Sequence, residues 1–535
     1  GGDQTDASNF VLDEIRDRPT DIKNRFQTGK LDFEWNVAKG FTVKFGGFYR
    51  GFQFHYISGK RDTTACPTVG APPIFGPGGF TCTSKTDGYS LASFPIGSDL
   101  ISLGDNGQPA GTSDQFIVAD LASATAFSGL YSRDGGPGTD PTNNRSVSER
   151  DKGGYLQFDA RGDLFGLDYA MNGGVRYVAT GTRSTALQAV QDSSGKVTGY
   201  APLTVPGHYD NWLPSINVNF FPRHDLILRL AAAQTMTRPS LPSLSPNASV
   251  DQFNFKISFG NPNLLPAVAT NYDAAIEWYF APQSLFAVGA FSKNVQNGTQ
   301  SVTTSGTFAS SGLPTSILTA GTPGYNAVTS GTGDVWTITS IRNAPTVSNI
   351  KGLEFTFQSP FRFLPGFLSH FGVLANLTLT DSHSTNTVTG PAAATYPGIP
   401  GTTTTSAQAG GLTNPTHPLP SVTVVSAYQG ASKTLYSATL YYEDAKFGAR
   451  VSYSYRGPYL DNTGGSNGNI NDGFAAYRTV DASMRYSITP NIDLTLDGVN
   501  LFDEYVYHYT DYQAQRNYEY YHTGRTLVFG ARFKF

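Results

Sequence analysis

The strongest constraint in the sequence is an alternation of apolar and polar side chains, with a period of two, that recurs in long segments. The end of the chain illustrates it, because every second residue there is apolar: Leu527, Phe529, Ala531, Phe533 and Phe535. A period of two indicates a β-strand, in which successive side chains point to opposite faces of the sheet. Segments of this length, with Asp, Arg and Ser opposite Phe, Leu and Tyr, favour membrane-spanning strands over those of a soluble sandwich.

Composition supports a membrane β-barrel. The chain has 58 glycines, 29 tyrosines and 36 phenylalanines but only 3 methionines, a mix that favours strands and turns over helices. Charged residues make up 15%, against roughly 25% in soluble domains, and no run approaches the roughly 18 apolar residues of a membrane helix. A barrel can still cross lipid, because it pairs every backbone N–H and C=O internally. The formal net charge of -4 gives no field that attracts nucleic acid, so we exclude nucleic acid as a partner.

About fifteen such segments follow one another along the chain. We expect strands near 25–38, 40–58, 150–161, 166–187, 208–221, 225–238, 270–280, 284–303, 347–359, 367–383, 433–443, 447–460, 474–487, 491–509 and 521–535. The connections alternate strictly between short and long, and the long ones are 59–149, 188–207, 239–269, 304–346, 384–432, 461–473 and 510–520. This alternation is typical of an outer-membrane barrel, with tight periplasmic turns and long external loops.

The odd number of strands has a consequence for closure. In an antiparallel barrel the first and last strands pair antiparallel only when the number is even, and an unpaired edge in lipid is costly. Either the count is wrong by one, or further strands come from an upstream segment or another chain. Residues 1–24 are expected to be the end of an extracellular loop or of a preceding strand, and residues 25–535 the barrel with its loops.

Two cysteines, Cys66 and Cys82, lie in a Pro/Gly-rich stretch of the first long connection. We favour a disulfide between them in an exported loop, and two free thiols are the alternative. Residues 114–130 predict a short helix behind a Ser113 or Asp114 cap, which should pack on the cysteine loop.

Catalytic chemistry is not indicated. The eight histidines are scattered without metal-ligand spacing, and the sequence contains neither a phosphate-binding glycine loop nor a nucleophile elbow. We therefore predict a protein that is not an enzyme and that has neither a metal nor a cofactor.

Aromatic residues near the end of the chain suggest a ligand site. If one strand runs over 491–509, the parity that turns Asp493 inward also turns Tyr505, Tyr507 and Tyr509 inward. Tyr512 and Arg516 follow just beyond the end of this strand. Such residues could form a stacking platform for sugars or planar ligands. The alternative is an aromatic girdle at the lipid headgroups or simple loop packing, and a bulge near Asn500 would shift the parity.

Several motifs resemble those of TonB-dependent receptors. They are TRPSL (237–241), GNPNLLP (260–266), NYDAAIEWYF (271–280), IKGLEFTF (350–357) and GVNLFDEYVYHY (498–509). The resemblance implies an all-β transmembrane antiparallel barrel of 22 strands around an N-terminal plug, of which this chain holds about 15 C-terminal strands without the plug. It also implies the bacterial outer membrane, the TonB energy complex and a small-molecule or oligosaccharide ligand. The terminal strand, with Gly530, Phe533 and Phe535, resembles the signal read by the barrel-assembly machinery.

The function that this resemblance implies is active uptake of a scarce nutrient, such as an oligosaccharide or a siderophore-like chelate, across the outer membrane. Two alternatives remain: a passive porin, and a surface structural protein anchored by a barrel.

Overall fold

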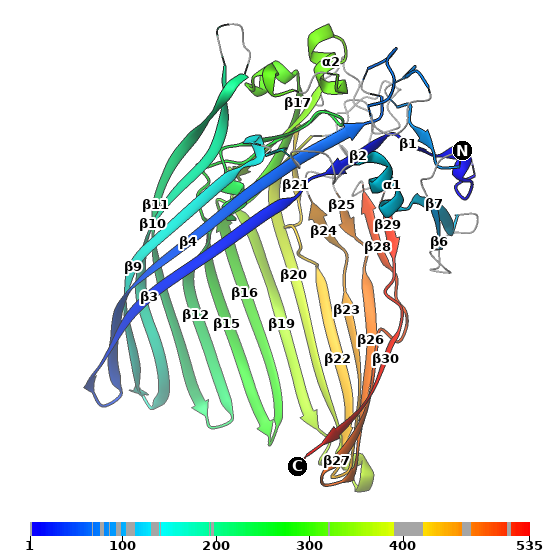
Figure 1. Cartoon of the computed structure of the whole chain (residues 1–535). Helices are drawn as coiled ribbons and strands as arrows, with labels where there is room; N and C mark the ends of the chain where they lie inside the picture. Colours follow the sequence, from blue (N-terminus) through cyan, green and yellow to red (C-terminus); the bar gives the residue numbers. More distant parts are fainter. Residues whose placement is uncertain are drawn as a thin grey trace.

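A curved antiparallel sheet forms most of the computed structural model (Figure 1). The structure describes residues 3–66, 68–74, 80–84, 86–92, 98–102, 113–129, 138–139, 141–191, 193, 197–318, 321–389, 421–462, 472–510 and 515–534. Among these residues no helix is both long and apolar enough to cross a membrane.

The barrel wall is a continuous ladder in which each strand pairs antiparallel with the next. In order, its strands are β3 (Thr20–Ala38), β4 (Phe41–Thr64), β9 (Arg145–Leu164), β10 (Leu167–Gln191), β11 (Val197–Arg223), β12 (Leu226–Thr237), β15 (Ala267–Ala281), β16 (Ser284–Gln296), β19 (Ser348–Pro360), β20 (Phe371–Thr389), β22 (Thr434–Glu443), β23 (Phe447–Arg456), β26 (Tyr477–Thr489), β27 (Ile492–Val499) and β30 (Thr526–Phe533). Within the described residues, no registered pair joins β3 to β30, and every residue of β3 is exposed. Figure 1 shows these strands at the two sides of the open front.

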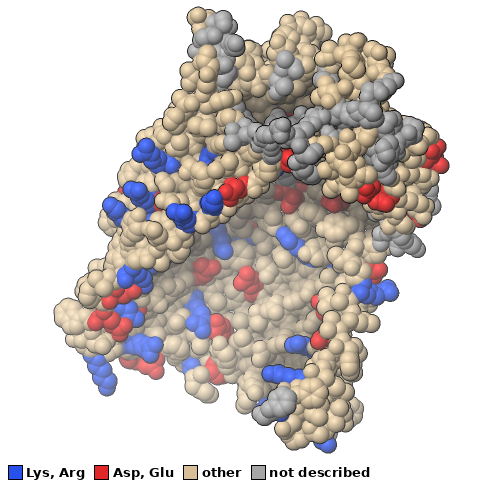
Figure 2. Space-filling model, in the orientation of Figure 1, with Lys and Arg blue, Asp and Glu red and all other residues tan. Residues whose placement is uncertain are grey.

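The two faces of the wall differ in polarity as the period of two predicts. Residues directly opposite one another in a ladder share a face, and Phe33, Phe45 and Leu156 form one such outward row, 42–54% exposed. The next row, Glu34, Lys44 and Gln157, faces the lumen. Figure 2 shows the hollow with Lys, Arg, Asp and Glu side chains on its wall. The sheet therefore has an apolar outer band and a charged lining.

Short turns join the strands at one end of the wall. The hairpin of β9 and β10 turns at Phe165 and Gly166, which both have positive φ (57° and 81°), as the tightest hairpins require. At the turn between β22 and β23, Asp444 accepts hydrogen bonds from the N–H groups of Phe447 (2.7 Å) and Lys446 (2.8 Å). These bonds lower the pKa of the Asp444 carboxyl to about 2.

Several expected strand ends are wrong. The strand expected over 447–460 ends at Arg456, and β24 (Tyr459–Asn462) belongs to another sheet. The connection expected at 188–207 is not a loop, because β10 and β11 stay paired as far as Gln191 and Val197. The strand expected over 284–303 breaks at Asn297, whose φ is +55°, and β17 (Thr299–Gly306) leaves the wall. Side-chain alternation predicts extended backbone, but it does not show where a strand changes partner.

Two long connections fold together above the wall. Strands β13 (Ala248–Asp251) and β14 (Lys256–Phe259) come from one, whereas β17, β18 (Trp336–Asn343) and helix α2 (Pro323–Ser330) come from the other. The four strands form one sheet in the order β13-β14-β18-β17, with a parallel pair between β14 and β18. Its core holds Ile257, Phe308, Leu318 and Trp336. These segments, expected as loops, therefore form one packed unit.

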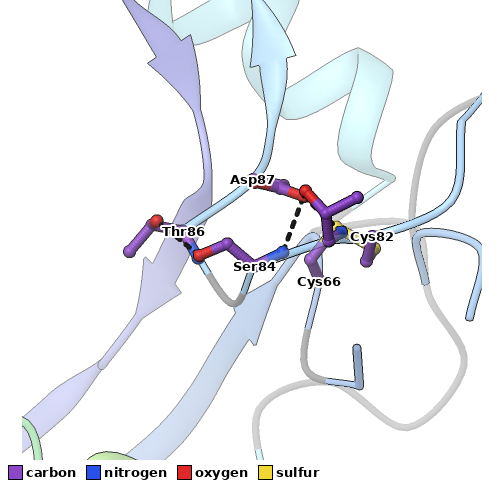
Figure 3. Close-up of a disulfide and its surroundings, with 6 residues drawn as sticks. Cys66, Cys82, Ser84, Thr86 and Asp87 are labelled. Carbon is purple, nitrogen blue, oxygen red and sulfur yellow. Dashed lines mark hydrogen bonds between the residues drawn. A yellow bond between two sulfur atoms is a disulfide. The ribbon is translucent and has the colours of Figure 1, made fainter. Parts of the chain in front are cut away.

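The first long connection contains the disulfide. Cys66 and Cys82 are bonded, which confirms that expectation, and their Cα atoms lie 5.5 Å apart. Figure 3 shows Asp87 beside this bond, accepting a hydrogen bond of 2.8 Å from the Ser84 N–H. Hydrogen bonds from the backbone of Ser84 and then Thr83 hold the pKa of Asp87 below its usual range.

The helix expected over 114–130 is shorter than predicted. Residues Gln115–Ala119 form strand β7, paired with β6 (Ser98–Ser102), and helix α1 spans Leu121–Ser128. Its cap is Asp120, which accepts from the Ser123 N–H, and not Ser113 or Asp114. The residues before it, QFIVA, favour a strand because they are aromatic and β-branched. Ala124 of α1 is buried with Ala65, the neighbour of Cys66, so the helix packs against the cysteine loop.

The remaining elements are short, and most of them lie in the long connections. They are η1 (Ala7–Asn9), β1 (Val11–Leu12), β2 (Glu14–Asp17), β5 (Tyr89–Ser90), β8 (Gly138–Thr139), η2 (Pro141–Asn143), η3 (Leu241–Leu244), η4 (Phe308–Ser311), η5 (Thr315–Ile317), η6 (Gly366–His370), β21 (Ser421–Ser426), β24 (Tyr459–Asn462), β25 (Asp472–Phe474), β28 (Val506–Thr510) and β29 (Arg516–Tyr521).

The facing of the wall can be tested with neighbouring arginine substitutions on β12. Leu230 is 51% exposed on the outer face, whereas Ala231 lies opposite Asp273 on the inner face. We expect Leu230→Arg to destabilise the folded protein by about 2–4 kcal/mol, and Ala231→Arg to have little effect. Urea-dependent unfolding from lipid vesicles measures both, and equal losses would contradict the assignment of faces.

Candidate ligand site on the inner wall

Two arginines and two aromatic rings meet on the lumenal face of β4, β9 and β10. The guanidinium of Arg50 lies 5.3 Å from the ring centroid of Phe48. The guanidinium of Arg176 lies 5.8 Å from Phe48 and 5.7 Å from Tyr155. Each arginine thus makes cation–π contacts that orient it on the wall.

Gly153 makes this arrangement possible. It lies directly opposite Phe48 on the neighbouring strand. A Cβ on Gly153 would come within 2.6 Å of the Phe48 ring and 2.3 Å of the Tyr177 carbonyl oxygen. The missing side chain therefore lets the ring lie flat against the wall beneath the arginines.

The lysines beside these two arginines each have a carboxylate partner. Lys30 pairs with Asp32 at 2.7 Å, and Lys44 pairs with Asp159 at 2.8 Å. Over the part of the chain that the structure describes, Arg50 and Arg176 have no ion pair with a carboxylate, and both are exposed. Two guanidiniums are therefore free to bind an anion, for which their planar donor geometry is suited.

A cavity of about 380 Å³ contains these groups. Its lining comes from β4, β9, β10, β11 and β12 and includes Phe48, Arg50, Tyr155, Arg176 and Arg238. The volume is in the range of small-molecule sites, and the lining combines aromatic surface with a few directed polar groups. This wall can therefore bind a small anionic or planar molecule.

A third arginine, Arg238, is bound to two carboxylates that are almost fully buried. Its Nη2 lies 2.9 Å from Asp151 and its Nε 3.4 Å from Glu149. Asp151 also accepts a hydrogen bond of 2.8 Å from the Thr180 hydroxyl. We call Arg238, Glu149 and Asp151 the Arg238 cluster. It ties the start of the connection after β12 to the wall, where Leu244 of that connection packs in the same cluster as Val147.

The Arg238 cluster lies above the apolar band of the wall. The residues of β9 that face outward at this height are Arg150 and Lys152, both exposed, whereas farther down the outward residue is Leu156. Burial raises the pKa of Glu149 to about 7, and the neighbouring Asp151 acts in the same direction, whereas Arg238 lowers it. Glu149 thus titrates near neutral pH.

The tyrosines expected to face the lumen do not continue the wall. Strand β27 ends at Val499, and Asn500 and Asp503 have positive φ (53° and 52°). Strand β28 then joins a separate sheet in the order β24-β25-β28-β29. The strand expected over 491–509 is therefore wrong, and its parity does not extend to the tyrosines.

The structure places these tyrosines within the protein. Tyr509 is fully buried, and Tyr505 stacks on Tyr520 with ring centroids 4.8 Å apart. The Tyr507 hydroxyl donates to the Gln515 carbonyl at 2.9 Å. Arg516 is exposed on β29, and Tyr512 lies outside the described residues. A ligand role for the set stays a prediction.

The terminal strand has the expected facing where it is described. Phe533 is 57% exposed on the outer face. A Cβ on Gly530, on the inner face, would meet the Thr495 hydroxyl at 2.7 Å. Phe535 lies outside the described residues, and the assembly signal stays a prediction.

Sequence reasoning missed an aromatic row at the upper rim. Arg456 lies 3.6 Å from the ring centroid of Tyr459, which stacks on Phe474 at 5.2 Å. Phe474 stacks on His508 at 4.4 Å, and His508 meets the edge of Tyr518 at 4.9 Å. The members come from four strands, so only their aromatic type was visible in the sequence. The described residues hold no cluster of His, Cys, Asp and Glu suited to a metal ion.

An apolar outer band, a charged lumen and tight turns at one end define this protein as a transmembrane β-barrel. The chain belongs to the family described as TonB dependent receptor-like, beta-barrel, whose model matches residues 2–501. This confirms the resemblance seen in the sequence, and it indicates the bacterial outer membrane as the location of the protein.

Solved structures agree on the fold. The chain is similar to the ferric citrate transporter FecA in its unliganded form (11% identity, TM-score 0.51, covering 98% of this chain and 56% of that one). It is also similar to the copper transporter OprC (12% identity, TM-score 0.51, 97% and 58%). The ferric yersiniabactin uptake receptor FyuA from Yersinia pestis also matches (10% identity, TM-score 0.48, 97% and 55%). The chain thus spans little more than half the length of these proteins, and no curated protein matches it.

The Arg238 cluster predicts a pH dependence. The pKa of Glu149 is about 7 when the Arg238 cluster is folded, against an ordinary value of 4.5. Protonation of Glu149 therefore stabilises the folded cluster. That contribution is complete below about pH 4.5 and is lost as the pH rises through about 7. We expect hydrogen exchange in 241–264, corrected for intrinsic rates, to be slower at pH 6 than at pH 8.

Glu149→Gln should remove this pH difference, because the variant has no titrating carboxyl at that position. The amides of β22 and β23 serve as the control, since neither strand pairs with β9 or β12, which hold or adjoin the Arg238 cluster. A pH difference that persists unchanged in Glu149→Gln would contradict the assignment.

Proposed function

We propose that the protein performs TonB-dependent active uptake of an anionic nutrient, such as a metal chelate or an acidic oligosaccharide, across the outer membrane. Family membership supports outer-membrane transport. The observation that carries the substrate class is the pair of unpaired arginines, Arg50 and Arg176, in the cavity of the inner wall. A receptor, not an enzyme, accounts for such a wall.

Each group on the wall has a role in binding. Arg50 and Arg176 donate hydrogen bonds to carboxylate, phosphate or phenolate oxygens of the ligand. Phe48 and Tyr155 hold the guanidiniums and offer their remaining faces to planar parts of the ligand. At the rim, the proposal keeps a second contact set from the sequence: Tyr505, Tyr507, Tyr509, Tyr512 and Arg516. Because Tyr509 is fully buried, it acts there by supporting its neighbours.

The proposal includes partners that complete the barrel and drive the transport. The outer edges of β3 and β30 have no partner strand in the described part of the chain, and in lipid they need further strands, supplied by the same protein or by another chain. The proposed transporter also needs a plug in the lumen and the TonB energy complex. Membrane lipid surrounds the apolar outer band. Ligand binding to the wall and loops precedes movement of the plug.

Energy dependence distinguishes active uptake from the alternatives. Cells that carry the full-length protein should accumulate labelled iron from a panel of carboxylate and catecholate chelates, or labelled acidic oligosaccharides. Accumulation should cease when the inner-membrane energy complex is deleted. Uptake that survives this deletion would favour a passive porin. If no probe is taken up, and if deleting 59–149 and 384–432 abolishes only surface attachment, the surface structural protein is favoured.

Substitution of the arginine pair tests the inner-wall site. We expect Arg50→Gln with Arg176→Gln to weaken binding of the transported anion by about ten- to a hundredfold, because each loses a hydrogen bond to a charged group. Arg450→Gln with Arg485→Gln is the matched control, because both arginines face the lumen but have partners: Arg450 donates to Ser483 at 2.7 Å, and Arg485 lies 3.5 Å from Glu443. Calorimetric titration of the purified receptor measures the three affinities. Equal loss in the control would show a general charge effect, and no loss in the pair would place the site elsewhere.

A further inference from the structure

Four basic side chains lie together on the outer face of the wall. Arg25, Arg150, Lys152 and Arg183 come from β3, β9 and β10, and all four are exposed. Their facing follows from the ladder: Lys152 lies opposite Tyr49, an outward residue that is 38% exposed. We call these four residues the basic patch. Figure 2 shows Lys and Arg gathered on the left of the view, over β3, β4 and β9.

The basic patch lies directly above the apolar band. One step down the outer face from Lys152 is a row that includes Tyr177 and Trp212, whose ring centroids are 4.8 Å apart. Leu156 follows on β9, 54% exposed. Aromatic side chains on the lipid face of a barrel mark the level of the headgroups. The basic patch is therefore at the height of the headgroups and just above them.

Outward cations elsewhere on the wall are neutralised. Lys351 on β19 lies 3.5 Å from Asp381, and Arg478 on β26 lies 3.5 Å from Glu504. Across the described residues, no member of the basic patch has an ion pair with a carboxylate. A chain with a net charge of -4 thus keeps four unneutralised cations on one part of its outer face.

The surface beside Arg150 is open at one of two neighbouring glycines. Gly51 and Gly181 lie directly opposite Arg150 on the strands to either side. No atom lies within 4 Å of the position that a Cβ on Gly181 would take. The Tyr49 hydroxyl would lie 3.3 Å from a Cβ on Gly51, so the surface beside Arg150 is bare on the β10 side, where a headgroup has room to approach.

We propose that the basic patch binds the phosphate of an anionic lipid of the outer leaflet, with the acyl chains lying on the apolar band below. Guanidinium groups bind phosphate oxygens through paired hydrogen bonds, and a basic cluster beside a bilayer attracts anionic headgroups. Continuity between the patch and the apolar band favours a lipid over a soluble phosphate, because one molecule can contact both surfaces. This site is independent of the nutrient site on the inner wall.

Native mass spectrometry of the full-length receptor tests the proposal. The receptor is released from neutral detergent micelles that contain phosphatidylglycerol or phosphatidylcholine at equal concentration. We expect retained phosphatidylglycerol, and less of it at high salt, because screening weakens exposed charge pairs. Arg150→Gln with Arg183→Gln should lower its affinity about tenfold. Lys351→Gln with Arg478→Gln removes the same charge on another part of the outer face and should leave the affinity unchanged.

Three outcomes would overturn the proposal. They are equal retention of both lipids by the unaltered receptor, equal loss in the two double variants, and full displacement of the lipid by an equal concentration of glycerol phosphate, which would indicate a site for soluble phosphate. If the patch variant does not fold, the lipid preference and the salt dependence of the unaltered receptor still test the proposal. A purely apolar contact with lipid would show neither of them.

Discussion

The structure depends on the pairing of backbone N–H and C=O groups where water is absent. A strand inside a bilayer has no solvent to satisfy these groups, so each strand needs a neighbour along its whole buried length. Among the described residues, the ladder from β3 to β30 meets this need for all but its two outer edges. Because pairing fixes the alternation of side chains, the same ladder produces the apolar exterior and the charged lumen. The inner-wall site and the basic patch both follow from that one alternation.

The strands of the wall could be predicted from the sequence because the alternation of side chains within one strand is a local pattern. Val480 and Met484 alternate with Asp481 and Arg485, and the structure turns the two sets to opposite faces. The rule failed at the upper rim, where strands leave the wall. Asn500 there has a φ of +53°, and the residues beyond it are still extended but belong to another sheet. A period of two describes the backbone of one strand and carries no information on its partner.

The site was less accessible, because its chemistry is decided by contacts distant in sequence. Arg50 and Arg176 matter through the absence of a carboxylate partner, which composition cannot reveal. Arg238 was visible within the TRPSL motif, but its partners, Glu149 and Asp151, lie far upstream. The tyrosines at the end of the chain attracted notice by their number, and the structure uses Tyr505 and Tyr509 in packing. The sequence thus showed where aromatic residues are concentrated, whereas the register of the strands determines which side chains face the lumen.

The sheet that joins the connections after β12 and β16 constrains how this protein can diverge. Its parallel pair, β14 with β18, fixes the offset between two segments encoded some eighty residues apart. An insertion of one residue within either strand would turn Ile257 or Trp336 from the core to solvent. An unpaired loop tolerates insertions of any length. In these two connections, tolerated insertions and deletions must fall outside the paired strands. Homologues should therefore keep these strands at constant length while the stretches between them vary.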